Sequence, residues 1–432
     1  MANDSQAFLN RCFLFDIETN EKGEIYSLGA WYNGKKFNSR QGRKVRREEL
    51  AEFDTFVSGA EFVLGHNILS HDLPCLHERA PTLAILQKPV VDTLYLSPLA
   101  FPENPYHRLV KNYQIVRDSI NNPAEDAVLA GKVFIEQWDV FLQLLAGGSD
   151  TPLIYRGFFH QVDRFAGISA AFEAMGVPLV AGDDLYDAFS WCIQNDVCRD
   201  ARNRLIEQLV DGRMEHPPLA YVLAWLVVSG GNSVLPPWVR HHFPVVPTII
   251  HQLREQPCTN PHCDYCKTNH NPKFFLKNYF GFEDFRSAPA TEDGQSLQGV
   301  IVSAAARNAS LFATLPTGGG KTLCYLLPAL MRYRRCNSLT IVISPLQALM
   351  KDQVENFSKQ TGTTLAAAIN GMLSMPERGE VMDGVRLGDV GVLYVSPEQL
   401  RNRSFVQTIS QCEIGAWVFD EAHCLSKWGH DF

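Results

Sequence analysis

The segment LPTGGGKT, residues 315–322, contains the residue types that bind a nucleoside triphosphate. Its glycines allow a tight turn with inward-pointing N–H groups, and the helical pattern that follows adds a dipole favourable to an anion. Lys321 would reach the β- and γ-phosphates, and the Thr322 hydroxyl would complete the coordination of Mg²⁺. Leu315 replaces the usual first glycine, so a glycine-rich turn without a ligand is the alternative. The residues expected around the phosphates and the Mg²⁺ are Thr317, Gly318, Gly319, Gly320, Lys321 and Thr322.

Two adjacent acids, Asp420 and Glu421, follow the apolar run GAWVF. Asp420 would hold Mg²⁺ through its coordination shell, and Glu421 would polarise the attacking water. The apolar runs at 311–313 and 339–343 and the run VGVLYV each precede a turn and a helical pattern, which predicts a parallel sheet covered by helices on both faces. Ligands of such sheets collect at the carboxyl ends of the strands, so we expect the loop and the two acids to converge.

A second group of acids lies in the first part of the chain. Asp16 and Glu18 belong to the strand-like run CFLFDIET, and side chains two apart on a strand share one face. A strand-like run at 62–64 leads through GHNILSHD to Asp72, and Asp126 begins an amphipathic helical pattern. Four carboxylates suit a site for two Mg²⁺ or Mn²⁺ ions, which would stabilise the attacking and leaving oxygens of a phosphodiester.

The segment CTNPHCDYCKTNH has the ligand spacing of a small metal site. Cys258, Cys263, Cys266 and His270 could surround one tetrahedral Zn²⁺, and the intervening Asn and Pro favour the turns that this requires. A closed site of this kind would be structural. His262 is an alternative ligand, and an iron–sulfur cluster or free surface thiols are alternative readings.

Composition sets the broad class. A chain of 432 residues with 46% hydrophobic content can bury several cores, and its length suggests roughly two to four domains. No signal peptide or membrane-spanning run is visible, so we expect a cytoplasmic, bacterial protein without a membrane partner, whose 11 cysteines are reduced or bind metal. The net charge of −8 argues against bulk electrostatic coating of nucleic acid.

Between the two groups of acids, residues 163–253 show helical spacing of apolar residues, with a Pro-rich bend near Pro236 and Pro237. We predict a helical connector whose tryptophans lie in the core, namely Trp191, Trp225 and Trp238.

The first part of the chain, over residues 10–145, resembles the DnaQ-like 3′–5′ exonucleases of the ribonuclease-H-like fold. The resemblance rests on FDIET, on GHN followed by HD, and on the last acid in a helix. That family carries a His or a Tyr shortly before its last Asp to activate water, where this chain has Asn121 and Asn122. His107 or His71 could substitute. An active nuclease, a slow or purely DNA-binding relic, and an unrelated domain are the three readings.

Basic residues cluster between the first two acids and the third. The functional reading is a hairpin that contacts the phosphate backbone, and the alternative is a solvated surface loop. The residues are Lys35, Lys36, Arg40, Arg43, Lys44, Arg46 and Arg47.

The last part of the chain, from about residue 276, resembles the first RecA-like lobe of the RecQ family of ATP-dependent DNA helicases. FGFEDFR, TGGGKT, SPLQALMKDQV, YVSPEQL and DEAHCLSKWGHDF carry the resemblance, in that order. It implies that Phe285, Arg286 and Gln298 recognise adenine. It also implies single-stranded DNA contacts by a backbone-following motif and by an aromatic-rich loop after the DEAH box. These contacts are Ser344, Pro345, Lys351, Gln353, Trp428 and Phe432.

The predicted organisation is an α/β protein in four parts. They are a ribonuclease-H-like exonuclease domain (1–150), a helical connector (151–250), a zinc-binding segment (251–277) and a partial P-loop RecA-like lobe (278–432). RecQ helicases complete their ATP site with an arginine from a second lobe. We therefore expect this chain to be an N-terminal fragment that binds nucleotide weakly and hydrolyses almost none. The whole protein would be a DNA-unwinding motor in repair, recombination or defence, acting on single strands and duplex junctions. A DNA-binding scaffold and a nucleotide-gated switch are the alternatives.

Overall fold

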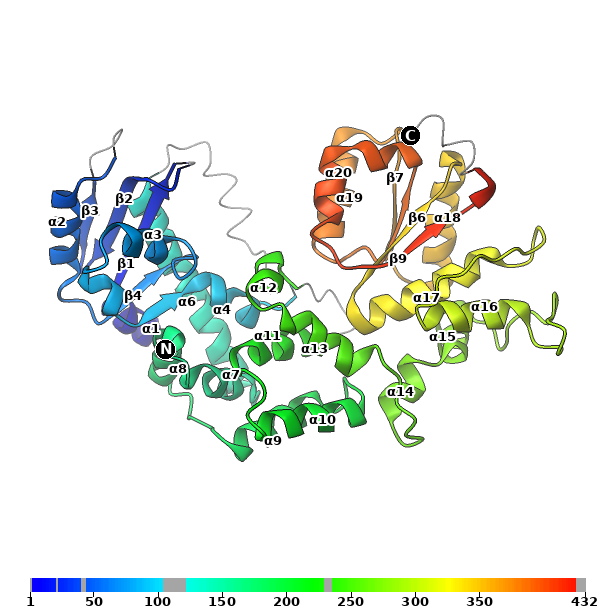
Figure 1. The fold of residues 1–432 in the computed structure, drawn as a ribbon, viewed down its shortest axis with the longest axis horizontal. Coiled ribbons are helices and arrows are strands. Elements are labelled where there is room, and N and C mark those ends of the chain that lie inside the picture. Colours follow the sequence, from blue (N-terminus) through cyan, green and yellow to red (C-terminus); the bar gives the residue numbers. More distant parts are fainter. Residues whose placement is uncertain (1, 21, 40–43, 104–121, 229–234, 425–432) are drawn as a thin grey trace. The chain divides into compact units, whose positions relative to one another are not determined.

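The computed structural model describes residues 2–20, 22–39, 44–103, 122–228 and 235–424 (Figure 1). The chain forms two compact units. The N-terminal unit consists of Met1–Cys192 and Ile206–Ala224, and the C-terminal unit consists of Ile193–Leu205 and Trp225–Phe432. Each unit contains one sheet and its own covering helices.

The N-terminal unit is built on a mixed five-stranded sheet with the order β3-β2-β1-β4-β5. Strands β1, β2 and β3 pair antiparallel, whereas β4 and β5 continue from β1 in parallel. The strands at 12–19 and 62–64 agree with the sequence prediction. The strand bounds are β1 (Cys12–Thr19), β2 (Ile25–Tyr32), β3 (Lys35–Asn38), β4 (Phe62–Gly65) and β5 (Val90–Asp92).

The two faces of β1 have different neighbours. Phe13, Phe15 and Ile17 pack with α2 (Arg47–Val57) in one apolar core. Leu14 lies on the other face against α6 (Pro123–Ala146), since a Cβ on Gly131 would lie 2.5 Å from its Cδ2. Because side chains alternate along a strand, Asp16 and Glu18 follow Leu14 toward α6, whose first turn carries Asp126. The other helices here are α1 (Ala2–Leu9), α3 (Asp72–Arg79) and α4 (Thr93–Ala100).

Gly29 on β2 allows α6 to approach the sheet, which gives a stability prediction. A Cβ at this position would lie 2.0 Å from the backbone nitrogen of Ala124 and 2.5 Å from the carbonyl carbon of Pro123. Gly29→Ala should therefore lower the free energy of unfolding by about 3 kcal/mol, because backbone cannot yield as a flexible side chain can. Urea unfolding measures this. Gly59→Ala is the control, since its Cβ would meet only the Tyr32 ring, at 3.4 Å or more; equal losses for both variants would refute the packing argument.

The helices predicted between residues 163 and 253 are present, but not all of their tryptophans are buried. Trp225 is buried as predicted, whereas Trp191 is 69% exposed and the prediction of a core residue there is wrong. Trp191 lies on α9, where the apolar face is formed by Leu185, Phe189 and Ile193 and leaves the indole on the opposite side. The helices are α7 (Thr151–His160), α8 (Ala166–Ala174), α9 (Asp183–Ile193), α10 (Arg199–Val210), α11 (Pro217–Leu226), α12 (Pro237–His242) and α13 (Val245–Arg254).

The C-terminal unit has a four-stranded, fully parallel sheet with the order β7-β8-β6-β9. Alternate residues of its central strands enter two separate cores. Val342 and Tyr394 face one core, and Ile341 and Leu393 face the other. This confirms the predicted parallel sheet with both faces covered. The strands are β6 (Leu339–Ile343), β7 (Ala366–Ile369), β8 (Val392–Val395) and β9 (Ile414–Phe419).

Helices cover both faces of this sheet. The first core contains residues of α15, α16, α17 and α18, and the second contains residues of α19 and α20. No helix in the described parts of the chain has both the length and the apolarity to cross a membrane. The helix bounds are α14 (Asp264–Asn269), α15 (Pro272–Phe280), α16 (Leu297–Ala306), α17 (Lys321–Cys336), α18 (Gln347–Thr361), α19 (Met375–Arg386) and α20 (Arg403–Ile409).

The segment before the glycine-rich loop is not the buried strand that its apolar residues predict. Residues 309–316 have no regular secondary structure, and Leu311 and Phe312 are 46% and 83% exposed. A strand requires ladder hydrogen bonds from a neighbour. Among the described residues, the edge strand β9 pairs with β6, and no ladder joins it to residues 309–316.

Candidate nucleotide, carboxylate and cysteine sites

The glycine-rich loop ends at the first residue of a long helix. Gly318 and Gly320 have φ values of 75° and 79°, a left-handed conformation that other residues adopt at a cost. The N–H of Gly319 donates to the carbonyl of Pro316 at 2.9 Å and closes the turn. Lys321 begins α17, and the N-cap residue Gly320 has no side chain to cap the N–H groups of the first turn. These N–H groups are therefore available to an anion.

Arg286 and Gln298 converge on this loop. Gln298 is only 3% exposed. Its Oε1 accepts from the backbone N–H of Arg286 at 3.0 Å, and its Nε2 donates to the carbonyl of Gly320 at 3.1 Å. The Arg286 guanidinium donates to the carbonyl of Gly318. The two side chains thus hold the loop through the carbonyl oxygens of Gly318 and Gly320.

A cavity of about 450 Å³ adjoins the loop and these side chains. Its wall combines aromatic rings with amide and charged groups, which suits a heterocyclic base. It is lined by Phe280, Phe282, Asp284, Arg286, Gln298, Gly320, Thr322, Leu323, Leu326, Gln353, Asn356, Phe357 and Gln360.

Asp420, which directly follows β9, lies close enough to Lys321 to interact with it electrostatically. Because β9 runs parallel to β6, its carboxyl end brings Asp420 to that of β6, and the Asp420 N–H donates to the Ile343 carbonyl at 2.9 Å. Burial raises the pKa of Asp420, the charge of Glu421 raises it further, and the positive charge of Lys321 lowers it. Glu421 has a φ of 52°, and its N–H donates to Asp420 Oδ1 at 3.1 Å. The structure therefore brings Lys321 near Asp420, whose neighbour in the chain is Glu421.

The residues predicted to contact DNA are placed unequally. Lys351 is exposed on α18, whereas Ser344 is only 5% exposed at the end of β6. Pro345 follows Ser344 and is half-buried, and Gln353 lines the 450 Å³ cavity. Trp428 and Phe432 lie outside the described residues, so their predicted stacking role stays a prediction.

Three of the four acids in the N-terminal unit form a tight group. The carboxylate oxygens of Asp16, Glu18 and Asp126 lie within 4.8 Å of one another. Burial, followed by the charges of Asp72, Asp126 and Glu18, raises the pKa of Asp16 to about 9. Burial and the charge of Glu18 also raise the pKa of Asp126. Like charges held this close are stabilised by a divalent cation, so the group fits a metal.

Asp72 lies beside this group but not within it. It is 2% exposed, and its Oδ1 accepts from the backbone N–H of Ile17 at 2.9 Å. Its Oδ2 is 3.2 Å from Nδ1 of His71, whose Nε2 is 3.2 Å from the Thr19 hydroxyl. The hydrogen bond to Asp72 raises the pKa of His71. The contact with Asp72 thus favours the protonated, positively charged form of His71 next to the acids.

Two residues near the acids were missed by the sequence reasoning. The Tyr26 hydroxyl donates to Glu18 Oε2 at 2.9 Å from the neighbouring strand. Asp92 is fully buried at the end of β5 and accepts from the N–H groups of Asn67, Leu69 and Leu94 at 2.8–2.9 Å. It therefore shapes the loop that delivers Asp72. The one sequence signal for Asp92 was its position directly after an apolar run.

The positions expected to supply a general base give a mixed picture. The Asn122 side-chain amide donates to Glu125 Oε1 at 2.8 Å, beside the start of α6. His107 and Asn121 lie outside the described residues. Of the two candidate histidines, His71 is the described one, and it lies beside Asp72.

Three of the five described residues of the basic cluster border an open cavity of about 840 Å³. Lys44, Arg46 and Arg47 line it together with Arg79 and Lys22, and Lys44 is paired with Glu24. Glu48 and Glu78 also line it, so the wall carries both signs of charge. Lys35 and Lys36 are exposed on β3, and Arg40 and Arg43 lie outside the described residues.

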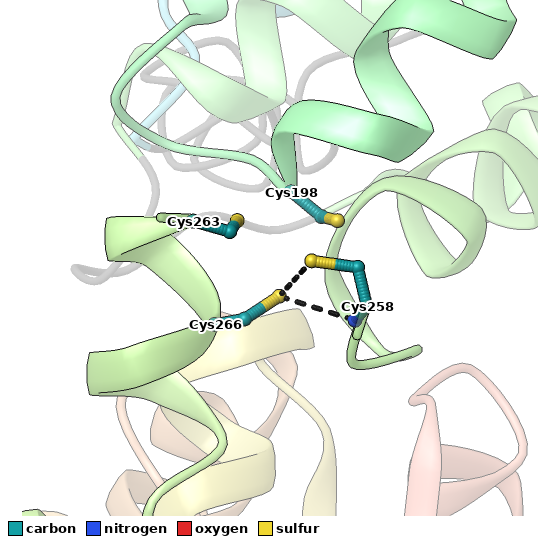
Figure 2. A group of neighbouring side chains, drawn as sticks. All are labelled: Cys198, Cys258, Cys263 and Cys266. Atoms are coloured by element: carbon teal, nitrogen blue, oxygen red, sulfur yellow. Dashed lines mark hydrogen bonds between the residues drawn. The ribbon is translucent and has the colours of Figure 1, made fainter. Parts of the chain in front are cut away.

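Four cysteines converge in the C-terminal unit, and the fourth is not the one predicted. Figure 2 shows Cys198, Cys258, Cys263 and Cys266 pointing toward one another. Their sulfur atoms all lie within 4.8 Å of one another. Cys198, and not the predicted His270, completes the group. The His270 Nε2 lies 3.0 Å from the carbonyl oxygen of Arg254. Cys198 directly precedes α10, far upstream of the other three, so spacing alone could not reveal it.

Comparisons with known proteins find similar sequences for the last third of the chain. A family model described as DEAD/DEAH box helicase matches residues 295–432. The ATP-dependent DNA helicase RecQ of Bacillus subtilis (strain 168) is 40% identical over 163 residues, which is 38% of this chain and 25% of that protein. RecQ of Haemophilus influenzae is 38% identical over 157 residues, 36% of this chain and 23% of that protein. The ATP-dependent DNA helicase Q4 of Homo sapiens is 41% identical over 124 residues, 28% of this chain and 10% of that protein.

These matches confirm the predicted resemblance for the helicase region. The matched segment spans about a quarter or less of the length of these relatives. It contains the glycine-rich loop, Gln298, and the acids at 420 and 421.

Proposed function

We propose that the C-terminal unit is the nucleotide-binding lobe of a RecQ-type ATP-dependent DNA helicase. The observation that carries the proposal is the convergence of Lys321 and Asp420 at the carboxyl end of a parallel sheet. ATP would bind with its phosphates at the N-terminus of α17 and its base beside Arg286 and Gln298. Mg²⁺ would be held by Thr322 and Asp420, and Glu421 would polarise the attacking water.

Single-stranded DNA is the proposed partner of this lobe. The names of the matched relatives state DNA helicase activity, and the exposed Lys351 on α18 provides a cation for the phosphate backbone. A test is the binding of a fluorescent ATP analogue to the 432-residue chain, with and without Mg²⁺ and oligonucleotide. Saturable Mg²⁺-dependent binding supports the proposal. Binding that is indifferent to Mg²⁺ would contradict it.

Gln298 provides a specific prediction for the nucleotide site. In Gln298→Glu the side chain can still accept from the N–H of Arg286, but it presents an oxygen to the carbonyl of Gly320. The resulting repulsion should open the loop and weaken ATP binding about tenfold, which corresponds to about 1.4 kcal/mol. Gln407→Glu is the control, because Gln407 is exposed on α20 and does not line the cavity. If both variants bind ATP with the affinity of the parent, Gln298 does not shape the loop.

For the N-terminal unit we propose a metal-dependent 3′–5′ exonuclease module of ribonuclease-H-like architecture. Its support is a mixed sheet with β1 at the centre, and acids from β1, α3 and α6 beside one face of that strand. Asp16, Glu18 and Asp126 would hold Mg²⁺ or Mn²⁺, and Asp72 would orient β1 and add negative charge. His71 would be the residue that polarises water.

A second candidate for this unit is DNA binding without cleavage. The observation that favours it is Asn122, which stands where a tyrosine base is expected and is hydrogen-bonded to Glu125. An amide has no proton-accepting role at neutral pH. Under this reading metal and DNA still bind, but the 3′ end is not trimmed.

A further inference from the structure

The four-cysteine cluster has the dimensions of a site for one tetrahedral ion. A Zn–S bond of about 2.3 Å sets neighbouring sulfurs of a tetrahedron about 3.8 Å apart. The Sγ atoms of Cys258 and Cys266 are 3.7 Å apart, and all four Sγ atoms lie within 4.8 Å of one another. A four-iron cluster places iron and sulfide between the cysteine sulfurs and needs them farther apart. A disulfide needs a much closer pair, about 2.05 Å.

The cluster is buried, and backbone N–H groups donate to two of its sulfur atoms. Cys198 and Cys263 are 1% and 0% exposed, and Cys266 is 9% exposed. The backbone N–H of Arg199 donates to Cys263 Sγ, and that of Cys258 donates to Cys266 Sγ, both at 3.5 Å. Such donors stabilise metal-bound thiolates and orient them.

We propose that Cys198, Cys258, Cys263 and Cys266 bind one Zn²⁺ ion in a closed structural site. Because all four positions are occupied by protein, the ion has no open position for water or substrate. Its role is to fasten the start of α10 to the segment that carries α14, although the two are far apart in the sequence.

The cluster is connected to the helix that begins at the glycine-rich loop. On α14, the Tyr265 hydroxyl donates to the carbonyl of Arg254 at 3.2 Å. The Arg254 guanidinium donates to the carbonyls of Arg334 and Arg335, in the last turn of α17. A cation here satisfies carbonyls that a helix end leaves unpaired.

A second contact runs in the opposite direction. Arg335 is fully buried, pairs with Glu255 at 2.9 Å and donates to the carbonyl of Asn269, the last residue of α14, at 3.2 Å. Breaking a buried ion pair of this kind is strongly destabilising. Zinc would therefore stabilise the segment that contacts the C-terminal end of α17. Loss of zinc should also weaken nucleotide binding at the N-terminal end of that helix.

The experiment is metal analysis of the full chain purified without chelators. We expect about one Zn²⁺ per chain and no iron. Cys198→Ser should reduce the bound zinc at least tenfold, because it removes a direct ligand. His270→Ala and the matched control Cys412→Ser should retain the zinc. Zinc loss in His270→Ala with retention in Cys198→Ser would overturn the assignment.

A measurement on the parent protein covers the case in which Cys198→Ser does not fold. Co²⁺ replacing Zn²⁺ should give the intense thiolate-to-metal absorption of four thiolates with tetrahedral bands, and Zn²⁺ should displace it. A spectrum typical of three thiolates and one imidazole would overturn the proposal, as would a chain that takes up neither ion. Because these readouts do not use ATP or DNA, they stand or fall apart from the proposed helicase function.

Discussion

Lys321→Ala should weaken the binding of ATP–Mg²⁺ to this chain by about 100-fold, which corresponds to about 3 kcal/mol. Lys321 is the first residue of α17 and is exposed, so the change removes a charge without opening a cavity in the core. Its positive charge lowers the pKa of Asp420, so the two groups lie near each other beside the glycine-rich loop. Titration with a fluorescent ATP analogue measures the effect.

The matched control is Lys359→Ala, which removes an exposed lysine of α18 that has a weak contact with Glu355 at 3.8 Å. It should bind nucleotide like the parent. DNA binding of Lys321→Ala should be unchanged, because Lys321 is assigned to the phosphates of the nucleotide. Parent-like ATP affinity in Lys321→Ala would exclude the nucleotide-binding proposal.

Protonation of Asp420 adds a pH dependence to the same measurement. Burial and Glu421 raise the pKa of this carboxyl group, so it takes up a proton at a higher pH than an exposed aspartate does. Mg²⁺ requires the ionised form. The advantage of Mg²⁺ in nucleotide binding should therefore decline as the pH falls, and it should do so before ordinary aspartates titrate.

Asp16→Asn should abolish metal-dependent trimming of 3′-labelled single-stranded DNA and, in the same variant, stabilise the metal-free protein. The activity should fall by at least about 1,000-fold, because Asp16 supplies one of the three carboxylates that would hold the metal ions. Stability should rise because the pKa of Asp16 is raised to about 9 by burial and by three neighbouring acids.

The sign of the stability effect follows from proton linkage. Between about pH 4 and pH 9, folded Asp16 holds a proton that the unfolded chain releases, so stability falls as the pH rises through this range. Asparagine removes this loss. We expect a gain on the order of 1 kcal/mol at pH 8 without divalent metal, seen as a higher melting temperature.

Asp139→Asn is the control, since Asp139 is exposed on α6, the helix that carries Asp126. It should change neither activity nor stability. If the parent trims no DNA in Mn²⁺ but Mn²⁺ still stabilises it, the DNA-binding reading of this unit gains. An Asp16→Asn variant that is no more stable than the parent without metal, and equally responsive to Mn²⁺, would contradict the metal site itself.

Sequence alone determined the local elements and the residues that they carry. The strands at 12–19 and 339–343, the helix after the glycine-rich loop, and the parallel sheet of the C-terminal unit follow from periodicity and turn residues, which act over a few neighbours. The motif order also identified the region that is similar to RecQ helicases, because the residues of each motif are contiguous.

Tertiary structure decided the contacts between distant segments. Cys198 replaced His270 because a sulfur far upstream reaches the cluster while the imidazole bonds to Arg254. Trp191 is exposed although its side chain is apolar, and residues 311–313 form no strand although the run is apolar. Burial and strand pairing depend on which neighbour the fold supplies, and a side chain's own type does not determine that neighbour.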